Sequence, residues 1–115
     1  MAASLEQRLA FFAAEPKQHL LRQIMRGIEK ESLRADPDGM LAQTDHPAAF
    51  GSALCHPSIT TDFSEALLEF ITPVSASIDE TLDELDAIHR FANSELNDEI
   101  IWNASMPCRL GEGDD

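Results

Sequence analysis

The stretch ITTDFSEALLEFITP, residues 59–73, decides the fold of this chain. It is an apolar run that carries three carboxylates and no basic residue: Asp62, Glu65 and Glu69. Read as a strand over 63–72, its alternation places Glu65, Leu67 and Glu69 on one face. Read as a helix over 61–70, its acids form one solvated stripe at spacings of three and four, with Asp62 as the cap. The pattern alone leaves both interpretations open.

The segments around this stretch carry clearer signals. Apolar residues recur at helical spacing in three places, which predicts helices over residues 4–14, 17–25 and 77–96. Gly27 and the turn DPDG, residues 36–39, indicate that the chain is extended on either side of that turn. We therefore expect a hairpin of two strands, over residues 27–35 and 40–43. Residues 43–58 and 100–115 read as loops, and the second of these is not expected to close the sheet.

Composition limits the function classes. The chain has 115 residues, of which 43 % are hydrophobic, so it forms one domain at most. Its 21 acidic and 8 basic residues give a net charge of −13, which argues against nucleic acid or an anionic membrane as a partner. We read no signal peptide, and expect Cys55 and Cys108 to be free thiols in a cytoplasmic protein.

The acids suggest a metal site if both acidic segments are strands. In strand 27–35, Glu29 and Glu31 share a face, and Glu69 would join them from a neighbouring strand. Clustered carboxylates repel one another unless a cation lies among them, and Mg²⁺ prefers such oxygen ligands. The simpler alternative is that IEKES, residues 28–32, forms a solvated helix face, and the sequence pattern does not exclude it.

Several motifs together resemble one enzyme family. They are RGIE-x-E-x-LR, the DG-x-LA-x-T-x-HP hairpin, GSAL-x-H, ITTDFSEALLEFITP, IHRFA and SMPC, which spread over about residues 20–110. This set is similar to the N-terminal part of glutamate–cysteine ligase (γ-glutamylcysteine synthetase) of the proteobacterial type. The resemblance implies an α+β fold, the N-terminal part of a glutamine-synthetase-like antiparallel sheet funnel with flanking helices. It therefore favours the strand interpretation of residues 63–72.

The resemblance also implies a reaction and a set of site residues. The family joins the γ-carboxylate of L-glutamate to the amine of L-cysteine through γ-glutamyl phosphate, using ATP and Mg²⁺, as the first step of glutathione biosynthesis. The matching positions make Glu29, Glu31, Asp62 and Glu69 the metal and cofactor ligands, with Glu29 and Glu69 catalytic. Phe63 would line the cysteine pocket, whereas Glu65 would not be a ligand and would either support the site or be solvated.

The chain also departs from the family pattern. WNASMPC, residues 102–108, lacks the proline that follows the tryptophan in some members. Family enzymes are much longer, so residues 1–115 are expected to be a single N-terminal fragment of the catalytic domain, inactive alone, whose partner is the rest of the ligase chain. Two alternatives remain: a non-catalytic acidic Mg/ATP-binding or subunit-association module, and a fragment that folds poorly and binds nothing.

Overall fold

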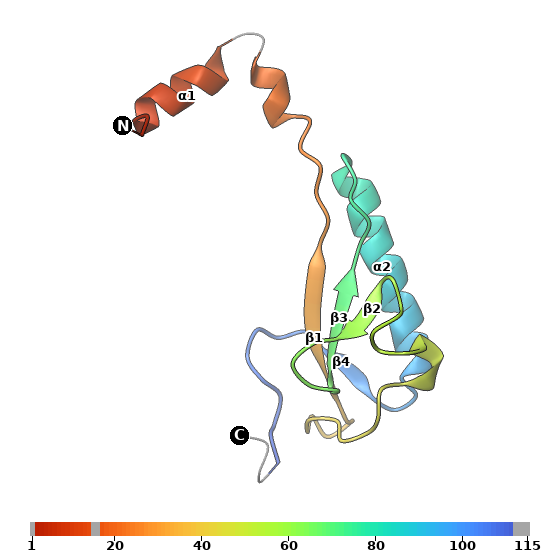
Figure 1. Ribbon diagram of the computed structural model, residues 1–115. Helices are drawn as coiled ribbons and strands as arrows, with labels where there is room; N and C mark the ends of the chain where they lie inside the picture. Colours follow the sequence, from red (N-terminus) through yellow and green to blue (C-terminus); the bar gives the residue numbers. More distant parts are fainter. Residues whose placement is uncertain (1, 15–16, 112–115) are drawn as a thin grey trace.

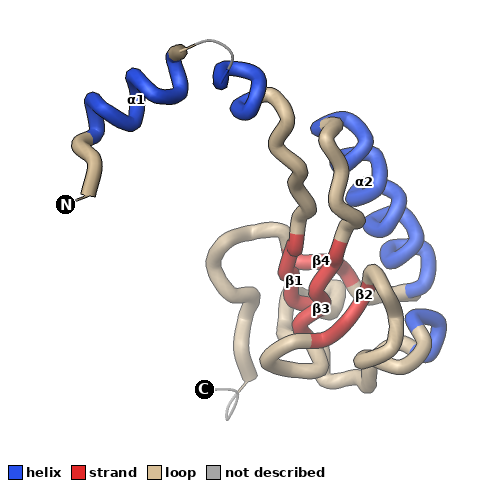
Figure 2. The backbone as a smooth tube through the Cα atoms, turned by 45° about the horizontal axis from the view of Figure 1, so that its top comes forward, coloured by secondary structure: helices blue, strands red, loops and turns tan. Residues whose placement is uncertain are grey.

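The computed structural model describes residues 2–14 and 17–111, and it has an α+β architecture. Four strands form one antiparallel sheet in the order β2-β3-β1-β4 (Figure 1). Their bounds are β1 Glu29–Ala35, β2 Ile59–Thr61, β3 Leu67–Ile71 and β4 Ile100–Trp102. One long helix, α2 (Ile78–Glu95), lies along one side of this sheet (Figure 2). Among the described residues, no helix is long and apolar enough to cross a membrane.

Residues 59–73 form a hairpin, which replaces the single strand expected over 63–72. The strands β2 and β3 pair in antiparallel register, with Thr60 opposite Glu69 and Thr61 opposite Leu68. Residues 62–66 turn between them, and the Leu67 amide donates to the Ser64 carbonyl across the turn. Asp and Ser compete for backbone hydrogen bonds and favour turns, which explains why the strand is interrupted here. The helical interpretation of 61–70 is wrong.

The core lies between the sheet and α2. Its largest members are Phe50, Leu68 and Phe70, which are fully buried. Around them pack Ile59, Ile88, Ala92, Leu96 and Ile101. The hydrophobic cluster takes Ile88 and Ala92 from the second half of α2, and the buried residue nearer the start of the helix is Thr81. The apolar side chains of Ile78 and Leu82, near the start of the helix, are exposed.

The N-terminal segment extends away from the sheet (Figure 1). It contains α1 (Leu5–Ala13), which has a complete capping box and no buried residue, and a 3₁₀ helix, η1 (Lys17–Leu21). The radius of gyration is 19.4 Å, against about 13 Å for a compact domain of this length. The helix expected over 17–25 ends early because Arg26 pairs instead with Ser75, through two backbone hydrogen bonds of 2.9 Å.

The DPDG turn forms, but the strand expected over 40–43 does not. The Asp36 carboxylate accepts from the amides of Asp38 and Met40, and Gly39 has a φ of 79°, which favours glycine. Beyond the turn, the chain makes isolated bridges only, from Leu41 to Ala35 and from Met40 to Arg109. The chain nevertheless stays beside β1, because the Ala42 amide donates to the Arg34 carbonyl at 3.0 Å.

The C-terminal segment adds a strand to the sheet, contrary to expectation. The strand β4 pairs with β1, with Leu33 opposite Trp102 and Ala35 opposite Ile100. Further on, the Arg109 amide donates to the Gly39 carbonyl at 2.9 Å, and the Arg109 carbonyl accepts from the Leu41 amide at 2.8 Å. The acidic end of the chain, residues 112–115, lies outside the described residues. β1 is therefore a central strand, paired with β3 over residues 29–33 and with β4 over residues 33–35.

Candidate metal-binding face

Three of the expected site residues share one face of the sheet. Glu31 lies directly opposite Glu69 in the β1–β3 ladder, and Glu29 is two residues earlier in β1. Alternation therefore puts all three carboxylates on the face opposite the core, since Ser32 and Leu68 point to the buried side. Like charges directly opposite each other on a sheet destabilise it. This face keeps an arrangement that costs stability in the absence of a cation.

Asp62 and Phe63 belong to the turn between β2 and β3. Both are exposed, and Phe63 is 94 % exposed, so no described residue covers its ring. Asp62 follows directly on β2, whose Thr60 is the other neighbour of Glu69. The turn thus brings Asp62 to the end of the hairpin that carries Glu69.

The electrostatics of Glu69 connect the four acids. Loss of hydration is the largest cause of the raised pKa of the Glu69 carboxyl, and the negative charges of Glu29, Asp62 and Glu31 raise it further. All three expected partners therefore act on Glu69, although they come from two strands and a turn. A bound cation would reverse this effect, because a nearby positive charge favours the ionised carboxylate.

The face carries ligands of the type that Mg²⁺ prefers, but they do not form a preorganised coordination site. Its donors are carboxylate oxygens, the ligands that a hard cation prefers. Within residues 2–14 and 17–111, however, no three His, Cys, Asp or Glu side chains are gathered closely enough to hold a metal ion as they stand. Metal binding to this chain would need side-chain movement or additional ligands.

A pocket lies on the same face, next to Glu31. It is about 320 Å³ in volume and is lined by Leu33, Leu67 and Trp102 from the sheet and by Met106 from the C-terminal segment. The indole Nε1 of Trp102 donates to the Met106 carbonyl at 2.7 Å, which holds that segment over the sheet. The amino-acid sequence does not indicate this pocket, because residues 100–102 show no strand pattern and were expected to lie in a loop.

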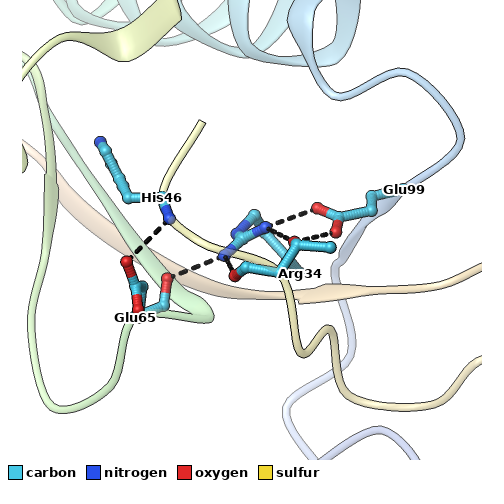
Figure 3. Close-up of polar contacts among 5 residues, drawn as sticks. Arg34, His46, Glu65 and Glu99 are labelled. Atoms are coloured by element: carbon cyan, nitrogen blue, oxygen red, sulfur yellow. Dashed lines mark hydrogen bonds and ion pairs between the residues drawn. The ribbon is translucent and has the colours of Figure 1, made fainter. Parts of the chain in front are cut away.

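The other side of the sheet contains a buried polar network around Arg34 (Figure 3). This side chain is 1 % exposed, and its guanidinium Nη1 pairs with Glu99 Oε2 at 2.7 Å. It also donates to the hydroxyl and the carbonyl of Thr44, at 2.6 and 2.8 Å, and to the Glu65 carbonyl at 3.1 Å. Strand parity with Ser32 could have indicated that Arg34 faces the core.

Glu65 takes part in this network and not in the acidic face. Its carboxylate accepts from the His46 amide at 2.9 Å, so it joins the turn to the loop before η2 (Ala48–Phe50). The His46 ring packs edge-on against Phe50. Burial, and then the charge of Arg34, lower the pKa of His46. The role of Glu65 in this structure is to anchor the turn.

Neither cysteine is paired. Cys55 is exposed and Cys108 is buried, and both are free thiols. Burial raises the pKa of the Cys108 thiol, which keeps it protonated at neutral pH. A protonated, buried thiol is a poor nucleophile, so Cys108 is not a candidate catalytic residue.

Comparison with known proteins identifies the family. The family model described as glutamate–cysteine ligase matches residues 9–115. The chain belongs to the glutamate–cysteine ligase family. It is 54 % identical to the glutamate–cysteine ligase of Pseudomonas paraeruginosa over 110 residues, which are 96 % of this chain and 21 % of that protein. It is 51 % identical to that of Azotobacter vinelandii over 115 residues, all of this chain and 22 % of the relative.

Solved structures agree with the family assignment. A crystal structure of the Francisella tularensis glutamate–cysteine ligase in complex with AMP matches with a TM-score of 0.75 and 45 % identity, over 78 % of this chain and 18 % of that one. A bifunctional glutathione synthetase from Pasteurella multocida matches with a TM-score of 0.77 and 41 % identity, over 81 % of this chain and 13 % of that one. The chain spans about a fifth of the length of the relatives that it matches.

Proposed function

We propose that this chain supplies the acidic, metal-binding face of a glutamate–cysteine ligase. The observation that carries the proposal is the register of the sheet, in which Glu31 faces Glu69 on the side that α2 leaves open. The ligase would transfer the γ-phosphoryl group of ATP to the γ-carboxylate of L-glutamate. The amine of L-cysteine would then attack the acyl phosphate and release phosphate, leaving γ-glutamylcysteine, the first product of glutathione biosynthesis.

Four side chains of this chain would hold Mg²⁺: Glu29, Glu31, Asp62 and Glu69. When bound, Mg²⁺ would neutralise the phosphate oxygens of ATP during phosphoryl transfer. Among these four acids we assign Glu29 and Glu69 a catalytic role. The charges of Glu29, Asp62 and Glu31 each raise the pKa of Glu69, which supports grouping these four acids. We assign the exposed ring of Phe63 to the cysteine site, because it stands next to Asp62 with no described residue packed over it.

In the proposed enzyme, the four-stranded sheet is one part of a larger curved sheet that forms a funnel. The remaining four-fifths of a ligase-length chain would complete that funnel. Both edge strands, β2 and β4, have only three residues and offer free edges for further pairing. The rest of the ligase chain is therefore the partner that we propose, and the protein would work in the cytoplasm. The isolated chain would be inactive, because one open face cannot enclose ATP and two amino acids.

The test is a ligase assay on two proteins. One is the purified 115-residue chain, and the other is a chimera in which this chain replaces the matching N-terminal residues of the P. paraeruginosa ligase. Each receives Mg²⁺, ATP, L-glutamate and L-cysteine, and γ-glutamylcysteine is detected by mass spectrometry. We expect product from the chimera alone, and a loss of at least about a hundredfold in kcat for its Glu69→Gln variant. A fully active Glu69→Gln chimera would contradict the assignment of Glu69.

A non-catalytic role is the second candidate. The feature that favours it is that all four acids occur within residues 29–69, so the isolated chain could bind Mg²⁺ or Mg·ATP as an acidic module or an associating subunit. Titration of Mn²⁺ into the 115-residue chain, followed by electron paramagnetic resonance of the free ion, tests this. Tight binding that requires Glu69, combined with an inactive chimera, would favour the module over the ligase.

A further inference from the structure

The guanidinium of Arg34 joins three segments that are distant in the sequence (Figure 3). Its Nη1 group contacts Glu99, just before β4, and Thr44, in the loop after the DPDG turn. Its Nη2 group contacts the carbonyl of Glu65, in the turn between β2 and β3. Because Arg34 is almost completely buried, water cannot replace these partners at low cost.

The contact with Glu65 matters because of what the turn carries. Residues 62–66 begin with Asp62, a proposed metal ligand, and Phe63, assigned to the cysteine site. Both side chains are exposed, so packing holds them little. Hydrogen bonds fix the other end of the turn: Arg34 donates to Glu65 from its side chain and to Ala66 from its amide, at 3.1 and 2.7 Å. The His46 amide adds a third bond, to the Glu65 carboxylate.

We infer that Arg34 is a positioning residue, whose guanidinium holds the 62–66 turn and thereby sets the place of Asp62 relative to Glu69. The inference rests on the proposed function for the role of Asp62, but the ordering of the turn stands independently of it. Arg34 itself does not reach the acidic face, because its side chain points to the core side of the sheet. It acts through the backbone of Glu65, from the opposite side.

A purely structural role for the buried ion pair makes a different prediction, so a matched control can separate the two. In Arg34→Gln the bond from the guanidinium to Glu65 is lost, whereas the backbone bond to Ala66 remains. In Glu99→Gln the ion pair is lost, but the guanidinium still reaches Glu65. Both variants lose stability, and only Arg34→Gln should loosen the turn.

The experiment measures ¹⁵N relaxation of the Asp62 and Phe63 amides in the 115-residue chain, together with its Mn²⁺ affinity. In Arg34→Gln we expect order parameters to fall from about 0.85 to below about 0.6, and the Mn²⁺ dissociation constant to rise at least fivefold. In Glu99→Gln both should stay close to the values of the unchanged chain. Arg34→Lys, which keeps the charge beside Glu99, replaces Arg34→Gln if the latter does not fold.

Every outcome decides between the two roles. A turn that stays ordered in a folded Arg34 variant overturns the inference, as does equal loosening in Glu99→Gln. If neither Arg34 variant folds, the residue supports the whole domain and not this turn, which also overturns it. If the unchanged chain does not bind Mn²⁺, the metal site needs ligands from the rest of the ligase chain, and the relaxation data alone decide whether Arg34 orders the turn.

Discussion

The buried ion pair between Arg34 and Glu99 gives the sharpest prediction about stability. Glu99→Gln keeps the size of the side chain and leaves an oxygen that can accept a hydrogen bond, but it removes the charge that faces a guanidinium only 1 % exposed. Removing one partner of a fully buried pair costs about 3–5 kcal/mol. Here Glu99 is 15 % exposed, and Arg34 keeps its bonds to Thr44 and Glu65, so the cost is smaller.

We expect Glu99→Gln to lower the free energy of unfolding by about 1.5–3 kcal/mol, the range for a hydrogen bond to a charged group. For a chain of this length, each kcal/mol corresponds to about 4 °C in Tm. The assay is thermal unfolding followed by circular dichroism, at low salt and in 0.5 M NaCl. The loss should be the same at both salt concentrations, because ions screen buried pairs only weakly.

The chain contains a matched control for this experiment. Asp86 and Arg90 form an ion pair with the same 2.7 Å distance, but their side chains are 60 % and 80 % exposed. Asp86→Asn should therefore cost less than about 0.5 kcal/mol. If Glu99→Gln loses no more stability than Asp86→Asn, the burial argument is wrong and the Arg34 network contributes little to the fold.

Three further predictions follow from single residues. The pKa of Glu69 is raised, so the folded state binds the Glu69 proton more tightly than the unfolded state does. As pH rises from the usual pKa of 4.5 through the folded-state pKa, the chain should therefore lose stability relative to its Glu69→Gln variant. Tm measured from pH 4 to 7 for both proteins, without divalent cations, checks this. Leu68→Ala, at a fully buried site, should cost about 2–5 kcal/mol in urea unfolding, whereas Leu67→Ala on the open face should cost less than half as much. Gly39→Ala should cost about 1–2 kcal/mol because of its φ of 79°, and Gly39→Asn less, measured by Tm.

Much of the acidic face could be predicted from strand alternation once the strand interpretation was adopted. Glu29, Glu31 and Glu69 lie on one face, as their parity predicts, even though the strand was expected to start too early. Residues 63–66 were expected to belong to a strand but form a turn. Glu65 therefore does not share the face of Glu69, because side chains in a turn do not alternate between two faces. Local pattern could not choose between helix and strand for this stretch, and the choice came from family resemblance.

The missed features depend on contacts between distant residues. β4 has only three residues, IIW, too few to show a period, and it becomes a strand because β1 offers it an edge. The helix expected over 17–25 has a correct apolar pattern, but a backbone pairing between Arg26 and Ser75 takes the chain in another direction. The burial of Arg34 likewise depends on its ion pair with Glu99, a residue that is distant along the sequence.

The central position of β1 has a consequence for how the chain folds. Its two neighbours are distant along the chain, and the pairing of Leu33 with Trp102 spans most of the domain. Contacts of this kind require closing a long loop before they yield any stabilisation, which slows folding. On a ribosome the β2–β3 hairpin could form early, but β1 would wait unpaired on one edge until residue 102 has left the exit tunnel.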